Sequence, residues 1–346
     1  MKTLIFPLFF TGILFILLTG ENIAYGVEKE NKIWATSKKS QQKWERLWSM
    51  IHDEMQLLDK ARPHGPKLKR RMVELKTEKM NLLKERENRY FLKEMEKGAI
   101  KRGEKESFFK KSQSLFKEIK TQALEIVKEF PNFRDTPEIY YTLALNERDY
   151  NDSTQLKHFA KKALNHTGLK KELKHKVQVV MAEHLYNEKK YQNANQFYQK
   201  VIANKNDQWR SKHLFNLGGC QFKLNKKSKA IETLHQALNE GRRTKIISIE
   251  NQIQKSLGLF YLKTERIMQG ISHYMKKDAT ASKNLQHLLK LAISQGTYQQ
   301  ALSVLTQLKK TAKDNTETRA YLKALNSGLE LYRGDKKYKN FIHEAK

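Results

Sequence analysis

The sequence contains few of the residues that would crosslink or interrupt its structure. Its 346 residues include one cysteine, five prolines and fifteen glycines. A single cysteine cannot form an internal disulfide, so the fold has to rest on a packed core. No strand-like alternation of useful length is present, and apolar residues recur at helical spacing almost throughout. The sequence therefore predicts an all-α fold.

Long apolar runs are missing everywhere except at the N-terminus. Residues 4–18 are almost entirely apolar, follow Lys2, and precede small residues at 24–26. This pattern predicts a secretory signal peptide over residues 1–26, with an uncleaved N-terminal anchor as the alternative. We therefore expect an exported protein that works in the periplasm or outside the cell.

Acidic residues are scarce relative to basic ones. The chain has 67 lysines and arginines against 37 acids, a formal net charge of +30, and only 15 of the basic residues are arginine. This lysine excess is not typical of specific nucleic-acid readers, because arginine is the better bidentate phosphate ligand. Compositional bias and a real preference for acidic proteins or anionic membrane surfaces both remain open.

Residue patterns of catalytic or metal-binding sites are also missing. There is no Gly-rich phosphate loop, and the eleven histidines stand in no metal-ligand spacing. Cys220 has no plausible local base and occupies an inner helical position, which indicates a buried structural thiol. The charged stretch 146–152 reads as a loop with solvated or capping acids. We expect no enzyme activity, no cofactor and no metal.

Three helices are expected in the N-terminal extension, residues 27–130. They run over about 40–61, 67–100 and 105–129, with two prolines and a glycine breaking the chain at 61–66. The dense charge of the second and third helices indicates solvated faces, with coiled-coil pairing as a lesser alternative.

Aromatic residues gather near the start of this extension. Trp34, Trp44 and Trp48 are three of the four tryptophans. They either cover the open end of the domain that follows or form a docking or membrane-surface face with the lysines nearby.

A repeat occupies residues 131–346 and is clearest in residues 214–238. Leu217-Gly218 and Ala230 stand where two antiparallel helices would cross closely, since only a small residue lets the backbones approach. The equivalent position is held in turn by Leu156, Ala194, Ala230, Gly270 and Ala301. This recurrence predicts five helix pairs, with a partial sixth near Gly334.

These residues resemble the tetratricopeptide repeat. The resemblance implies a right-handed superhelical solenoid of antiparallel helix pairs that binds proteins or peptides along a concave groove. The segments 72–91, 130–150 and 206–231 also resemble exported tetratricopeptide proteins of predatory and gliding bacteria, the adventurous gliding motility type. That likeness implies a periplasmic scaffold in a cell-envelope complex, although this chain is richer in lysine.

In this repeat family the first helix of each pair lines the groove. The matching positions here, with a further residue that often binds ligand backbone, are Tyr141, Arg148, Lys176, Tyr186, Lys212, Phe215, Asn216, Phe222, Lys255, Lys283, Gln286 and Lys290. Lysines among aromatics would suit an extended acidic peptide. Alternatively, a chain of charge +30 places lysines everywhere, and the protein binds anionic envelope surfaces through bulk charge. The sequence predicts neither the partner nor the oligomeric state.

Overall fold

A computed structural model describes residues 38–61, 65–98, 109–150, 152–244, 249–275 and 281–311. Over these ranges the chain forms thirteen α-helices and no strand, which confirms the predicted all-α fold. The helices are α2 (Lys38–Lys60), α3 (Pro66–Glu96), α4 (Lys110–Glu129), α5 (Thr136–Asp149), α6 (Ser153–Leu164), α7 (Lys171–Asn187), α8 (Tyr191–Ile202), α9 (Arg210–Lys223), α10 (Lys227–Arg243), α11 (Glu250–Lys263), α12 (Ile267–Met275), α13 (Ala281–Gln295) and α14 (Tyr298–Thr311).

Within the described ranges, none of the helices combines the length and apolar character that crossing a membrane requires. The expected signal peptide, Trp34 and the partial sixth repeat lie outside the described residues.

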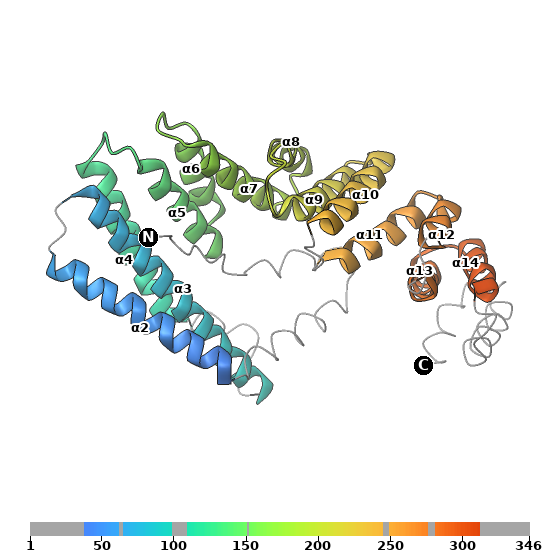
Figure 1. The fold of residues 1–346 in the computed structure, drawn as a ribbon, viewed down its shortest axis with the longest axis horizontal. Helices are drawn as coiled ribbons and strands as arrows, with labels where there is room; N and C mark the ends of the chain where they lie inside the picture. The colour runs from blue at the N-terminus through green and yellow to red at the C-terminus, as the bar shows by residue number, and fades with distance from the viewer. Residues whose placement is uncertain are drawn as a thin grey trace. The chain divides into compact units, whose positions relative to one another are not determined.

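The chain divides into two compact units, residues 1–180 and 181–346, and the division falls inside α7. In the first unit α2, α3 and α4 lie side by side, and α4 packs against α5 (Figure 1). Pro66 opens α3 after the expected break, because proline is tolerated at the first helical position. Thr136 is the first residue of α5 rather than its cap, since Asp135 holds the N-cap position.

The two described tryptophans of the N-terminal extension, Trp44 and Trp48, hold α2 onto α3. Trp44 and Trp48 stack with ring centroids 5.1 Å apart, and the indole N–H of Trp44 donates to the carbonyl oxygen of Leu82 at 3.1 Å. Both rings pack on a cluster that includes Ile51 and Leu75. Trp44 and Trp48 therefore pack inside the N-terminal extension. The helices of the extension that contact α5 are α3 and α4.

The succession from α5 to α14 matches the five predicted helix pairs, and the fold is a tetratricopeptide-like helical solenoid. In the second unit α9 packs closely on α10, and the other pairs there are α11 with α12 and α13 with α14 (Figure 1). The crossing positions Ala194, Ala230 and Ala301 are completely buried. A methyl group on Gly218 would lie 2.9 Å from the Leu234 side chain and 3.3 Å from the Ala230 carbonyl oxygen, so the absence of a side chain there favours the close crossing of α9 and α10.

The turns inside three helix pairs share one unusual backbone conformation. Lys189, Asn225 and Glu265 have φ angles of 60°, 59° and 60°. Each lies five positions before the small crossing residue of its repeat. The amide that follows each of them donates back to the last turn of the first helix, as in a Schellman motif, for example Lys190 N to Leu185 O at 2.9 Å. The same turn therefore forms with Asn225, which tolerates a positive φ angle, and with Lys189 and Glu265, which do not favour it.

Candidate functional site

The candidate site is the row of first helices in the second unit. Phe222 of α9 stacks on Phe260 of α11 with ring centroids 3.8 Å apart, and α11 packs against α13. Phe222 is half-buried, whereas Phe260 is fully buried. Three accessible side chains of these helices, Phe222, Lys255 and Lys290, are here called the first-helix face.

Two of the predicted groove residues are in the core. Phe215 is 5% exposed, and Asn216 donates its amide N–H to the hydroxyl of the buried Tyr198 at 3.1 Å. The expectation that Phe215 lines an open groove is therefore wrong, because its side chain is buried. The space beside the neighbouring Gly219 is occupied by the hydroxyl of Tyr186. Helical position alone could not show that Phe215 and Asn216 are buried, since α9 is buried on most of its circumference.

Lys212 is neutralised within the protein. Its ammonium group lies 3.2 Å from a carboxylate oxygen of Glu183, and both side chains are largely buried. A partly desolvated ion pair of this kind has little attraction left for an external anion. Lys212 is therefore a structural residue of the contact between α7 and α9 within the second unit.

Lys255 and Lys290 are different. Both are exposed, and among the described residues no acidic side chain forms an ion pair with either. Burial, and then the charges of Lys255 and Lys290, lower the pKa of the His287 imidazole. Lys290 lies three residues after His287 on α13, and α11, which carries Lys255, packs against α13.

The remaining predicted residues are dispersed. Tyr141 and Arg148 are half-buried on α5, and Lys176 is exposed on α7, all in the first unit. Gln286 is half-buried on α13, next to His287, and the side chain of Lys283 lies outside the described part of the chain. The role of these residues in binding stays a prediction.

The charged stretch 146–152 is expected to be a loop, but its first four residues belong to the last turn of α5 (Thr136–Asp149), and one of its acids is less solvated than expected. Asp152 caps α6 by accepting a hydrogen bond from the amide of Gln155 at 2.9 Å. Glu147 is only 2% exposed and lies 2.6 Å from the ammonium group of Lys120 on α4. Lys120 also lies over the ring of Phe159. The acid therefore joins α4 to α5 and has no open face for catalysis.

Cys220 is buried, as the sequence predicts. Its side chain is completely inaccessible, and burial raises the pKa of the thiol to about 12. Because the thiolate is the reactive form, this environment makes a poor nucleophile.

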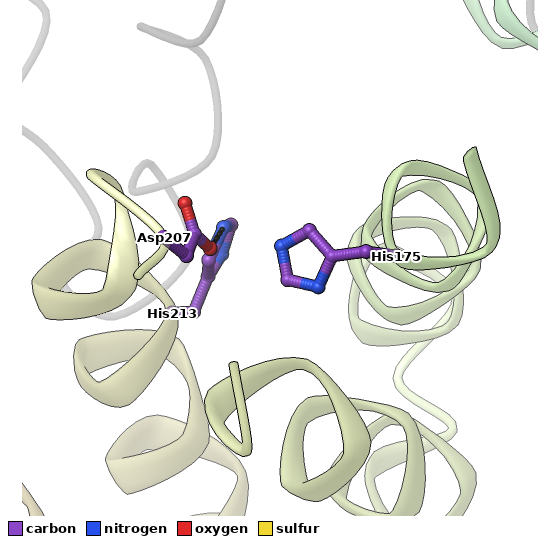
Figure 2. A group of neighbouring side chains, drawn as sticks. All are labelled: His175, Asp207 and His213. Atoms are coloured by element: carbon purple, nitrogen blue, oxygen red, sulfur yellow. Dashed lines mark ion pairs between the residues drawn. The ribbon is translucent and has the colours of Figure 1, made fainter. Parts of the chain in front are cut away.

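One histidine pairs with an acid at the start of α9. Figure 2 shows Asp207 and His213 pointing toward one another, with the imidazole Nε2 atom 3.2 Å from the carboxylate. Asp207 also accepts a hydrogen bond from the amide of Trp209 at 2.9 Å. The pair therefore fixes the first turn of α9. His175, the third residue drawn, belongs to the part of α7 in the first unit.

Sequence reasoning grouped His287 with the scattered packing histidines and did not single out its position beside Lys290. A signal was present, because His287 and Lys290 are three residues apart and so share one helix face. The approach of Lys255 depends on how α11 packs on α13, and periodicity does not report that contact.

The chain is similar to several proteins of known structure at low identity. RapI, in its apo form, is 15% identical with a TM-score of 0.43, over 74% of this chain and 94% of that one. PilF of Pseudomonas aeruginosa is 17% identical with a TM-score of 0.38, over 61% and 90%. A signal-transduction ATPase with a tetratricopeptide repeat sensor, from Pyrococcus horikoshii, is 13% identical with a TM-score of 0.41, over 86% and 52%. No protein-family model and no curated protein matches the sequence.

Proposed function

We propose that the chain is a non-enzymatic scaffold that binds a segment of another protein on the first-helix face of its second unit. The proposal includes export by residues 1–26 and action in a cell-envelope complex of the gliding motility type. The observation that carries it is that Lys255 and Lys290 are exposed and have no ion-pair partner among the described residues, on two helices, α11 and α13, that pack against each other. The half-buried ring of Phe222 stacks on Phe260 of the same α11.

The helix pairs support a binding role because their apolar residues are used in the core. The crossing residues and their neighbours are buried, so the stack presents mostly polar and charged side chains. A rigid stack of helices holds these groups at fixed spacing, and such pre-organisation lowers the entropic cost of binding an extended segment.

Charge supports an acidic partner. With a net charge of +30 the whole chain attracts anions over a distance, which speeds encounter. Affinity at one place, however, requires basic groups that are not already paired. Lys212 is paired with Glu183, so among the described groove lysines of the second unit Lys255 and Lys290 are the ones to test.

The proposal is tested by crosslinking in intact cells, followed by binding of the purified partner. We expect a defined protein partner, recovered from the periplasmic fraction, whose affinity falls as salt rises but persists at physiological salt. An enzyme activity in the purified chain, or the absence of any protein partner, would contradict it.

The alternative is a protein that coats anionic envelope surfaces by bulk charge. Its signature would be co-sedimentation with phosphatidylglycerol vesicles or lipopolysaccharide that disappears in moderate salt. Replacing any two exposed lysines would then weaken binding equally.

A further inference from the structure

We propose that a hollow at the C-terminal end of α6 is a binding site for a phosphate monoester, carried by a sugar or by a lipid headgroup. The site is built mainly on the second helix of the first pair and lies in the first unit, so it goes beyond the proposed scaffold function and does not depend on it. The hollow measures about 370 Å³, and the described residues that line it are Tyr140, His158, Lys161, Lys162, Asn165 and His166.

The lining of this hollow consists of hydrogen-bond donors. His158, Lys161, Lys162 and Asn165 follow at intervals of three and four residues, so they share one face of α6 and its C-cap. Both lysines are exposed, and neither forms an ion pair with a described residue. The hollow therefore presents two positive charges, and no carboxylate is among the described residues that line it.

The hydroxyl of Tyr140 is a polar group that the fold leaves unused. The side chain is only 8% exposed, and its ring stacks on Phe159 with centroids 6.3 Å apart and lies 5.3 Å from the ammonium group of Lys162. No described residue forms a hydrogen bond with the hydroxyl, which is accessible from the hollow. Most polar groups on buried side chains have a partner, so this one points to a ligand.

His166 is held with a second donor available. Its Nδ1 atom accepts a hydrogen bond from the amide of Gly168 at 3.0 Å, so the neutral imidazole carries its proton on Nε2. A Cβ atom on Gly168 would lie 2.8 Å from the Arg134 carbonyl oxygen and 3.3 Å from that Nδ1 atom, so glycine lets the turn close on the ring. No described residue uses the Nε2–H group, which leaves it to donate into the hollow.

A phosphate monoester matches these donors in charge and in number. It carries about −1.5 to −2 charges at neutral pH and three acceptor oxygens, against two lysines, an imidazole and a hydroxyl. A carboxylate would leave one lysine charge unmatched. Lysines in a last helical turn also favour the helix dipole, but that explains neither the hydroxyl nor the imidazole. The volume falls in the range of small-ligand sites, about 300–1,000 Å³, so the group that carries the phosphate fits as well.

The test is isothermal titration calorimetry of the full chain with glucose 6-phosphate, and with glucose as the unphosphorylated control. K161Q/K162Q removes both charges and should lower the affinity by at least about tenfold. The matched control K117Q/K128Q removes two charges from exposed lysines on α4 in the same unit and should change the affinity by less than about twofold. Circular dichroism checks that both variants fold.

A second variant isolates the hydroxyl of Tyr140. Y140F keeps the ring against Phe159 and Lys162 and removes one hydrogen-bonding group, so the affinity for glucose 6-phosphate should fall by about threefold. This loss does not depend on charge, and a bulk electrostatic effect would not produce it.

Vesicles distinguish the two sources of the phosphate. Phosphatidic acid carries a phosphate monoester, whereas phosphatidylglycerol carries a diester. A preference for phosphatidic acid vesicles that K161Q/K162Q and Y140F both abolish would support the site and assign the ligand to a lipid. Binding of glucose 6-phosphate without this preference would support it and assign the ligand to a sugar phosphate.

Three results would overturn the inference. The first is that neither glucose 6-phosphate nor phosphatidic acid vesicles bind. The second is an equal loss of affinity in K161Q/K162Q and K117Q/K128Q, which would mean that bulk charge binds the probe. The third is an unchanged affinity in Y140F, which would mean that the phosphate binds outside this hollow.

Discussion

At the scale of single residues, Gly218 and Gly219 are neighbours with opposite reasons for lacking a side chain. A methyl group on Gly218 would meet Leu234 at 2.9 Å and the Ala230 carbonyl at 3.3 Å, both in the crossing of α9 and α10. At Gly219 it would meet the hydroxyl of Tyr186, the free end of a side chain that can turn away. At Gly218 one of the contacts, with the Ala230 carbonyl, is with backbone that cannot turn away, whereas the three nearest atoms at Gly219 all belong to the Tyr186 side chain.

We therefore expect Gly218→Ala to destabilise the fold by about 1–3 kcal/mol through overpacking. Gly219→Ala should be neutral or stabilising by up to about 1 kcal/mol, because alanine favours the helix. Urea denaturation followed by circular dichroism measures both. Equal effects of the two substitutions would show that the crossing at Gly218 is not tight.

Lys189 and Glu265 carry a backbone cost that glycine would remove. Both lie in the left-handed region at φ 60°, where residues with a Cβ atom are disfavoured. Lys189→Gly and Glu265→Gly should each raise the free energy of unfolding by about 0.5–1 kcal/mol. Asn225→Gly is the matched control and should gain less, since asparagine tolerates this conformation. A loss of stability in the first two variants would contradict this reading of the turns.

Cys220 should be inert in the folded chain. Burial raises the pKa of its thiol to about 12, so the thiolate is rare at neutral pH. We expect a thiol-reactive disulfide reagent at pH 8 to label the native chain slowly and the urea-unfolded chain rapidly. Rapid labelling of the native chain would show that the helix pair opens easily at α9.

At the scale of elements, one ion pair joins α4 to the first helix pair. Lys120 is 30% exposed, whereas Glu147 is 2% exposed. Lys120→Ala would leave a buried carboxylate unpaired and should destabilise the fold by about 1–3 kcal/mol. Lys117→Ala, on the exposed side of the same helix, should stay within about 0.5 kcal/mol. Similar values for the two variants would mean that α4 docks through apolar contacts alone.

Helices and their pairing were accessible from the sequence because both follow from local patterns. The prolines near residue 66 and the small residues at Ala194, Ala230 and Ala301 mark breaks and crossings directly. The state of the groove residues was not accessible in the same way. Lys212 and Lys255 hold related positions on first helices, and only packing decides that Glu183 reaches one and no described acid reaches the other.

At the scale of the whole molecule, the excess of basic charge is general and its use is local. Attraction of anions by a net charge of +30 fades over a Debye length of about 8–10 Å at physiological salt. Specific binding then depends on exposed basic groups that have no ion-pair partner, and among the described residues Lys255 and Lys290 are the ones that the proposed function uses. A scaffold of this kind should bind faster in low salt, yet keep its preference for one segment.

The most direct test of the central claim is a photo-crosslinking map in intact cells. A photoreactive amino acid replaces Phe222, Lys255 or Lys290 on the first-helix face, or Lys229 or Lys309 on the second helices. We predict that one protein partner crosslinks from the first three positions and not from the last two. Crosslinking of that partner from the second helices, or equally from all five positions, would contradict the claim that the first-helix face is the binding surface.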